Sequence, residues 1–347
     1  CPNRANSMAG ESLYLIDGSS YLFRAYHALP LLSNSKGVPT GAVYGFTNML
    51  LKIIRDKRPD AVVVIFDPPG PTERHERFAD YKANRAEMPH ELSLQFPYIH
   101  RVVEAMRIPL LIQPGQEADD LIGSVARQAA AEGRRVTILT GDKDMLQLVE
   151  PRVQVYDPMK EKVYGEPEVV ERFGVSPGQV VEVMGLMGDA IDNIPGVRGI
   201  GEKSAKNLIQ QFGTIEELLA RLSEVKSSKV REILRSQAEQ ARLSRSLALI
   251  RTDLPVGLDL KQIALQQPDE AALQALFRDL EFTGLQRTFA ATASSGSMRV
   301  IPLDREEEVE RVARDLLASD EVAIAVVRND GEQAGSRVRG VAVCLEP

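Results

Sequence analysis

The sequence has little cysteine and no long apolar run. Its two cysteines, Cys1 and Cys344, stand at opposite ends of a chain of 347 residues. This spacing supports neither a disulfide framework nor a zinc site, and it fits a reducing cytoplasm. No apolar segment is long enough to cross a bilayer, and residues 1–7 lack the apolar core of a signal peptide. We therefore expect a soluble cytoplasmic protein with no membrane partner.

The composition is that of an ordinary globular protein whose charges are unevenly distributed. Hydrophobic residues make up 44% of the chain and charged residues 26%, and the length allows two or three domains. The net charge of −7 by itself argues against a nucleic-acid partner. Residues 196–251, however, contain eleven Lys and Arg against six Asp and Glu. Such a stretch is typical either of a phosphate-binding surface or of solvated helices.

Three short apolar runs predict buried strands at residues 12–17, 61–67 and 135–140. They are too apolar to alternate, which favours a parallel sheet covered on both faces. Apolar residues at helical spacing between them predict helices at 41–57 and 117–132. Alternating strands and helices indicate an α/β fold with a mainly parallel central sheet flanked by helices. Ligands bind at the carboxyl ends of such strands, and each run ends at or near an aspartate, namely Asp17, Asp67 and Asp142.

These aspartates belong to a longer series of acids that we interpret as candidate metal ligands. Two pairs, Glu117 with Asp120 and Asp189 with Asp192, would each share one face of a helix. The third strand is followed by two aspartates whose side chains an extended loop would point the same way. Oxygen ligands without His or Cys suit Mg²⁺ or Mn²⁺ better than zinc. The series is Asp17, Asp67, Glu117, Asp119, Asp120, Asp142, Asp144, Asp189 and Asp192.

Clustered carboxylates repel one another and resist burial unless cations neutralise them. The chemistry that such a cluster suits is two-metal phosphodiester hydrolysis, which activates water and stabilises the attacking and leaving oxygens. Each acid also has a simpler interpretation by itself. A strand-end aspartate can cap a helix or form a turn, and residues 117–120 can be a helix start whose dipole favours acids.

Six blocks occur in the order of a known family: residues 15–24 (LIDGSSYLFR), 66–75, 81–85 (YKANR), 117–120 (EADD), 140–144 (TGDKD) and 188–205. Together they resemble the 5′-nuclease domain of bacterial DNA polymerase I, within the flap endonuclease superfamily, over residues 12–289. The resemblance implies a PIN/flap-endonuclease-like catalytic domain over 12–176, with a helical arch near 70–97. It also implies a helical DNA-binding subdomain over 177–289 and two or more Mg²⁺ ions, or Mn²⁺, held by the acidic series.

The resemblance implies further roles for basic and aromatic residues. Lys82 and Arg85 in the arch would neutralise the scissile phosphate, and Arg24 would contact the same region. Cations interleaved with rings in the arch are what a path for single-stranded DNA requires, with Arg74 and Tyr81 as candidates. Tyr21 or Phe23 could stack on an unpaired base, and either could equally belong to the core.

A Gly-rich turn at residues 196–206 resembles a helix-hairpin-helix-like element that grips duplex DNA and can hold a K⁺ ion. Backbone N–H groups at such a turn bind phosphate without reading bases. The residues that would form this contact are Gly196, Gly199, Gly201, Lys203 and Lys206.

The end of the chain is interpreted as a second, incomplete domain. Residues 290–297 are small and polar and predict a flexible linker. Residues 298–347 resemble the start of a 3′–5′ exonuclease-like, RNase H-like domain, truncated at Pro347. The expected strand at 322–327 has no acid where metal ligands would lie, so we expect this part to be inactive. The resemblance places a polymerase domain beyond it, and residues 1–11 are interpreted as a disordered lead-in with Met8 as the natural start.

The function expected from these features is a structure-specific 5′–3′ exonuclease and flap endonuclease. We expect a monomeric, nucleoid-associated enzyme acting on DNA with 5′ flaps, nicks or RNA primers during primer removal and repair. A stand-alone flap endonuclease would need neither the linker nor the tail. A non-catalytic junction binder would be indicated by the loss of one or more acids. An RNA-cleaving PIN-type domain would lack the arch and the Gly-rich element.

Overall fold

The computed structural model describes residues 12–260, 262–293, 310, 314, 322–328 and 338–345. The chain divides into two compact units, Cys1–Ala291 and Thr292–Pro347. The expected lead-in at 1–11 and residues 294–297 of the expected linker lie outside the described residues.

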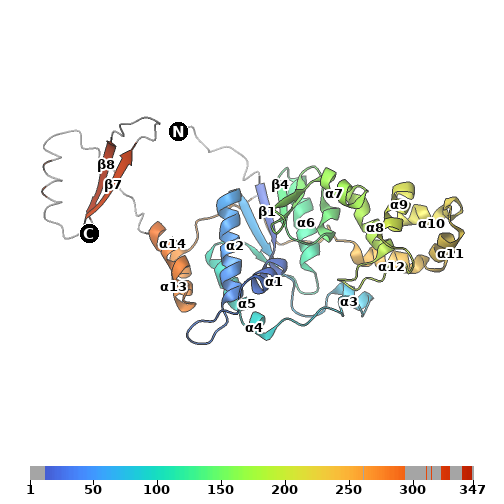
Figure 1. Cartoon of the computed structure of the whole chain (residues 1–347), viewed down its shortest axis with the longest axis horizontal. Coiled ribbons are helices and arrows are strands. Elements are labelled where there is room, and N and C mark those ends of the chain that lie inside the picture. The colour runs from blue at the N-terminus through green and yellow to red at the C-terminus, as the bar shows by residue number, and fades with distance from the viewer. Residues whose placement is uncertain are drawn as a thin grey trace. The chain divides into compact units, whose positions relative to one another are not determined.

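A six-stranded sheet forms the centre of the first unit (Figure 1). Its order is β3-β2-β1-β4-β5-β6, and all strands are parallel except β6, which runs antiparallel to β5. This confirms the predicted, mainly parallel sheet, and it puts the ends of the three acid-bearing strands side by side. The strands are β1 (Ser12–Asp17), β2 (Ala61–Ile65), β3 (Leu110–Leu111), β4 (Arg135–Leu139), β5 (Val153–Asp157) and β6 (Lys162–Tyr164).

Helices cover both faces of the sheet, as the apolar strands predicted. Val62 and Val64 of β2 belong to one core, and Val63 and Ile65 belong to the core on the opposite face. The first core is completed by α1 (Gly18–Ala28), α2 (Gly41–Lys57) and α5 (Phe96–Ala105), and the second by α6 (Ala118–Ala131). Helices α2 and α6 lie where the sequence predicted them.

The segment at 70–97, predicted as a helical arch, contains only two short helices before α5 begins. These are α3 (Glu73–Arg77) and α4 (His90–Ser93), and residues 79–84 between them form turns. Lys82 within these turns has φ of 55°, in the left-handed region. Prolines flank the turns and the short helices, and proline interrupts helical hydrogen bonding. The arch is therefore a chain of turns and short helices in this conformation.

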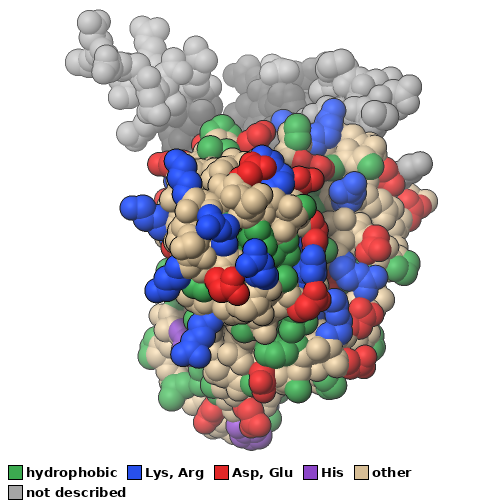
Figure 2. Space-filling model, turned by 90° about the vertical axis from the view of Figure 1, so that its right-hand side faces the viewer, with side chains coloured by type: hydrophobic (Ala, Val, Ile, Leu, Met, Phe, Trp, Pro, Cys, Tyr) green, Lys and Arg blue, Asp and Glu red, His purple; other side chains and the backbone are tan. Residues whose placement is uncertain are grey.

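A helical region follows the sheet. Helix α8 packs against α9 and α12 at its centre. Figure 2 looks onto this end of the molecule and shows Lys and Arg side chains intermixed with Asp and Glu. The predicted basic stretch therefore does not form a surface of one sign. The helices are α7 (Glu166–Phe173), α8 (Val180–Met187), α9 (Glu202–Phe212), α10 (Ile215–Ala220), α11 (Ser228–Ser236) and α12 (Ala238–Ala248).

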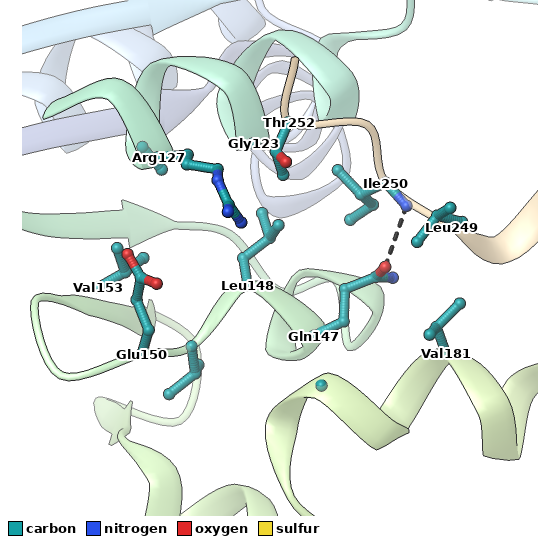
Figure 3. Close-up of a pocket in the computed structure, with 13 residues that line it drawn as sticks. Gly123, Arg127, Gln147, Leu148, Glu150, Val153, Val181, Leu249, Ile250 and Thr252 are labelled. Atoms are coloured by element: carbon teal, nitrogen blue, oxygen red, sulfur yellow. Dashed lines mark hydrogen bonds between the residues drawn. The ribbon is translucent and has the colours of Figure 1, made fainter. Parts of the chain in front are cut away.

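Gln147 fastens the end of this helical region to the sheet domain. Its amide accepts a hydrogen bond from the N–H of Ile250 (3.0 Å) and donates one to the carbonyl of Ala248 (3.0 Å). It lies at the edge of a pocket of about 330 Å³ between α6 and the chain that leaves α12 (Figure 3). Gln147 belongs to the short 3-10 helix η1 (Asp144–Leu148), which begins at one of the candidate ligands.

The chain then returns along the sheet domain to α13 (Glu270–Asp279) and α14 (Thr283–Ala293), which join the core of α2 and α5. Because α14 includes residues 290–293, the first half of the predicted linker is helix, which its alanines favour. In the second unit, β7 (Val322–Arg328) and β8 (Val338–Leu345) form an antiparallel pair, and β7 covers the strand predicted at 322–327. None of the helices in the described ranges has the length and hydropathy of a membrane span.

Candidate active site

The carboxyl ends of β1, β2 and β4 border a pocket of about 470 Å³. Asp17 is the last residue of β1, and Asp67 and Asp142 follow β2 and β4 within three residues. Helix α6, η1 and the loop after α8 contribute the other acids. The structure thus brings together seven of the nine predicted ligands: Asp17, Asp67, Asp119, Asp142, Asp144, Asp189 and Asp192.

The strand-end acids also act as caps, so both interpretations of them apply. Asp17 accepts hydrogen bonds from the N–H of Ser20 at the start of α1 (2.9 Å) and from the hydroxyl of Thr140 (2.7 Å). Asp67 accepts one from the N–H of Ala118 at the start of α6 (2.9 Å). These bonds fix the carboxylates at the sheet edge while they still line the pocket.

The sequence predicted that Asp189 and Asp192 share one face of a helix, and this prediction was wrong. Helix α8 ends at Met187, and the two aspartates lie in a tight loop closed by paired backbone hydrogen bonds between Asp189 and Ile194. Gly188 ends the helix with φ of 75°, a conformation that L side chains disfavour. Both carboxylates nevertheless reach the pocket, because the loop turns back toward it.

The pocket's carboxylates are buried and crowded. Burial raises the pKa of Asp17 to about 7, and the neighbouring charges of Asp67 and Asp142 add to the effect. Burial also raises the pKa of Asp119, Asp142 and Asp144, with repulsion from other carboxylates contributing. Within the described part of the chain, the buried Oδ1 of Asp144 has no hydrogen-bond partner. An all-oxygen donor set with an unpartnered buried carboxylate oxygen fits divalent cations of the Mg²⁺ class.

Basic side chains reach into the same pocket and pair with its acids. Lys82 Nζ lies 3.2 Å from Glu117 Oε1 and 3.8 Å from Asp192 Oδ2, and Arg85 forms an ion pair with Asp192. Burial alone would lower the pKa of Lys82, but the surrounding carboxylates outweigh it and raise the pKa. Among the described residues, no three His, Cys, Asp or Glu side chains are grouped closely enough in this conformation to hold one metal ion.

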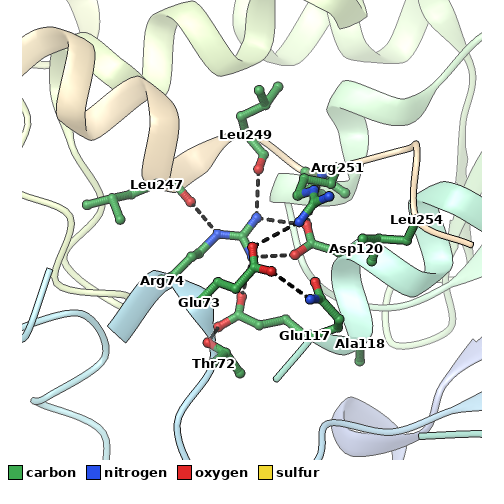
Figure 4. A network of polar contacts seen from close by, with 12 residues as sticks. Thr72, Glu73, Arg74, Glu117, Ala118, Asp120, Leu247, Leu249, Arg251 and Leu254 are labelled. Carbon is green, nitrogen blue, oxygen red and sulfur yellow. Dashed lines mark hydrogen bonds and ion pairs between the residues drawn. The ribbon is translucent and has the colours of Figure 1, made fainter. Parts of the chain in front are cut away.

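Glu117 is the N-cap residue of α6 and not part of the helix that the sequence predicted to carry it with Asp120; both acids meet Arg74 and do not line the pocket (Figure 4). Arg74 uses all five of its guanidinium N–H groups. It donates to Glu117 (3.0 Å), twice to Asp120 (2.6 and 2.8 Å), and to the carbonyls of Leu247 (2.9 Å) and Leu249 (2.6 Å). The side chain is only 8% exposed. The predicted DNA contact of Arg74 was therefore wrong, because no donor is left for a phosphate.

Two of the predicted aromatic contacts are also buried. Tyr21 is 1% exposed within the core, whereas Phe23, the alternative, lines the pocket. Tyr81 is 3% exposed, and its hydroxyl donates to Glu117 Oε2 (3.1 Å) and approaches Asp192 Oδ2 (3.4 Å). Direct base contacts predicted for Tyr21 and Tyr81 were therefore wrong. Arg24 lies beside the pocket residue Gly141, where an added Cβ would come within 3.1 Å of its Nη2.

The Gly-rich turn divides into structural and exposed parts. The N–H of Gly196 donates to the buried hydroxyl of Ser244 (3.0 Å), and a Cβ on Gly196 would lie 2.4 Å from the nitrogen of Gly188. A phosphate contact by Gly196 was therefore a wrong prediction, because this glycine serves a close backbone crossing. Gly199, Gly201 and Lys203 are exposed at the start of α9 and stay candidates.

Lys206 is folded back against the protein. Its ammonium contacts Glu202 (2.6 Å), the carbonyl of Arg172 (2.8 Å) and the face of the Phe173 ring (5.5 Å). Two of the three ammonium donors are thereby bonded to protein oxygens, so Lys206 is held against the end of α7, and its phosphate contact stays a prediction.

Sequence reasoning missed two basic residues that line the pocket, Lys143 and Arg172. Lys143 pairs with Asp189 and stands between two candidate ligands in the block at 140–144, which could have drawn attention to it. Arg172 lies on α7, far from every quoted block, and had no local signal. It is one of several exposed arginines in the sequence.

Comparisons with known proteins assign the two halves of the first unit. The family described as "5'-3' exonuclease, N-terminal resolvase-like domain" matches residues 12–174, and "5'-3' exonuclease, C-terminal SAM fold" matches residues 175–271. In fold, the chain is similar to the bacteriophage T5 D15 flap endonuclease, with a TM-score of 0.58 and 23% identity. That likeness covers 81% of this chain and 99% of the other.

Two curated relatives are similar in sequence. DNA polymerase I of Bacillus caldotenax is 43% identical over 97% of this chain, but this chain spans only 38% of that protein's length. The 5'-3' exonuclease of Aquifex aeolicus (strain VF5) is 39% identical over 79% of this chain and 94% of its own length. The chain therefore belongs to the 5′–3′ exonuclease family, whose N-terminal resolvase-like domain and C-terminal SAM fold it contains in order.

Proposed function

We propose that the acidic pocket binds two divalent cations and hydrolyses phosphodiester bonds of DNA near junctions between single strand and duplex. The observation that carries this proposal is the convergence of seven carboxylates on one pocket, from the carboxyl ends of β1, β2 and β4, from α6, from η1 and from the loop after α8. The T5 D15 structure is titled as a complex with DNA and metal ions, which supports both parts of the proposal. Mg²⁺ is the expected physiological ion, with Mn²⁺ as a substitute and K⁺ as a further ion at the Gly-rich turn.

The roles of this chain's residues follow from where they lie. Asp17, Asp67, Asp119, Asp142 and the other pocket acids would hold the cations, which when bound supply an activated water and charge neutralisation at the reacting oxygens. Lys82 and Arg85 would exchange their carboxylate partners for the scissile phosphate, with Arg24 beside Gly141 approaching the same phosphate. Glu117 forms an ion pair with Lys82 and accepts a hydrogen bond from the Tyr81 hydroxyl, which holds both side chains in place.

We further propose that this chain is the front part of a DNA polymerase I that removes RNA primers and displaced 5′ flaps in replication and repair. The relative from Bacillus caldotenax, of which the chain spans 38%, supports this. In that setting residues 298–347 would begin an inactive 3′–5′ exonuclease-like domain. The enzyme would act as a monomer close to the nucleoid.

A flap-cleavage assay tests the proposal. A DNA substrate labelled at the end of its 5′ flap is incubated with the chain and Mg²⁺, with EDTA, and with the Asp142→Ala variant. We expect release of the flap only by the wild type with metal. Asp60→Ala, which removes an acid at the opposite end of the sheet, should cleave normally. Cleavage in EDTA, or a wild-type rate in Asp142→Ala, would contradict the proposal.

A further inference from the structure

Arg172 is a positive group of the pocket that forms no ion pair among the described residues, although Glu202 is near enough to interact with it electrostatically. The residue is exposed, and it lines the same pocket as the seven acids and Arg85. In the described parts of the chain no carboxylate lies within ion-pair distance of it, whereas Lys82, Arg85 and Lys143 are all paired. An exposed and unpaired arginine beside a phosphodiester-cleaving pocket has its guanidinium N–H groups available for a phosphate.

The position of Arg172 is fixed by α9. Lys206 donates to the carbonyl of Arg172 (2.8 Å), and Gln210 donates to the carbonyl of Gly174 (2.7 Å). Phe173 between them is 3% exposed, with the Arg172 guanidinium 5.7 Å from the centre of its ring. The end of α7 is therefore anchored to the helix whose start carries the exposed Gly-rich turn.

We propose that Arg172 binds a backbone phosphate of the DNA strand that enters the pocket, and that Lys206 positions it. This assignment rests on the nuclease function proposed above and extends it. The sequence predicted that Lys206 contacts the phosphate. In this assignment Lys206 instead anchors the end of α7, and Arg172 contacts the phosphate. Positive groups then reach the DNA from two elements, Arg85 from the turns after α3 and Arg172 from α7.

The magnitude follows from counterion release. Each phosphate that a protein neutralises adds about 0.7 on single-stranded DNA, or about 0.9 on duplex DNA, to the magnitude of the slope of log affinity against log salt concentration. At 0.1 M salt, loss of one such contact corresponds to about five- to eight-fold weaker binding by the same relation. A phosphate contact is insensitive to sequence, so the loss should be the same for flaps of different sequence.

The test is equilibrium binding of the full chain to a labelled 5′-flap DNA over a range of KCl concentrations. Ca²⁺ replaces Mg²⁺, and the substrate is checked afterwards for cleavage on a denaturing gel. Arg172→Gln should lower the magnitude of the salt slope by about 0.7 to 0.9, and Arg172→Lys should restore most of it. Arg101→Gln is the matched control, because Arg101 is also exposed and lies 5.9 Å from a ring, that of Tyr98, but does not line the pocket.

The Lys206→Gln variant tests whether Lys206 positions Arg172 or contacts the DNA itself. It should weaken binding in the wild-type chain and add nothing in the Arg172→Gln background, with urea unfolding used to check that each variant is folded. The proposal is overturned if Arg172→Gln binds with the wild-type slope, or if Lys206→Gln lowers the slope further when Arg172 is absent. If the wild type itself binds no flap DNA, the proposed function fails instead.

Discussion

Replacement of Arg74 by Gln should destabilise the protein strongly, because it removes the cation between two buried carboxylates. Glu117 and Asp120 have side chains only 3% and 4% exposed, and Arg74 is the partner that both share. Breaking a buried ion pair from one side costs about 3–5 kcal/mol of unfolding free energy. In a domain of this size that corresponds to a fall in Tm of at least about 6 °C. The carbonyls of Leu247 and Leu249 would also lose their donor.

Urea unfolding followed by far-UV circular dichroism measures the change. Arg77→Gln is the control, since Arg77 is an exposed arginine on the same short helix and should stay within about 0.5 kcal/mol of wild type. Asp120→Asn in the Arg74→Gln background should cost less than it does alone, since the two residues are directly coupled. The reasoning is refuted if Arg74→Gln unfolds like the wild type and instead lowers the salt slope of DNA binding, because Arg74 would then be a phosphate contact.

Three further predictions concern neighbouring residues. Asp119→Asn should abolish flap cleavage without loss of unfolding free energy, because it relieves the crowding of carboxylates in the pocket. Asp120→Asn should instead lower the unfolding free energy by about 3 kcal/mol, because it breaks the ion pair with Arg74. Equal effects in the two variants would contradict this. Lys82→Gln should lower the single-turnover rate constant of cleavage by about 100- to 1000-fold, with little change in flap affinity. A wild-type rate constant would refute the role of Lys82 at the scissile phosphate. Gly196→Ala should lose more unfolding free energy than Gly133→Ala. Both glycines have positive φ, but of the two only Gly196 has a backbone atom 2.4 Å from an added Cβ. Equal losses would disprove the close-crossing argument.

The sequence was sufficient for the sheet and for the acids at its edge, because these depend on local patterns. The mostly apolar strand at 12–17 and the fully apolar strand at 61–65 require cover on both faces, and parallel strands end at the same edge. Their terminal aspartates therefore had to come together. Helices α2 and α6 follow from apolar periodicity in the same way.

The roles of the basic residues depend on partners far away in the chain, which no local pattern reveals. Arg74 stands in a segment rich in cations and rings, and only the fold shows that carbonyls 173 and 175 positions later accept its hydrogen bonds. The sequence predicted Lys206 as a phosphate ligand, but in the fold its ammonium donates to the carbonyl of Arg172 on α7. The loop of Asp189 and Asp192 has helical spacing, yet Gly188 ends the helix just before it.

The central claim is that the pocket's carboxylates hold divalent cations, and metal binding tests it most directly. Mn²⁺ binding followed by electron paramagnetic resonance gives the number and affinity of ions without relying on catalysis. We predict two ions per wild-type chain and fewer or weaker ions in Asp142→Asn, with Asp60→Asn unchanged. Absence of bound Mn²⁺ in the wild type, or wild-type binding in Asp142→Asn, would contradict the assignment of this pocket as the metal centre.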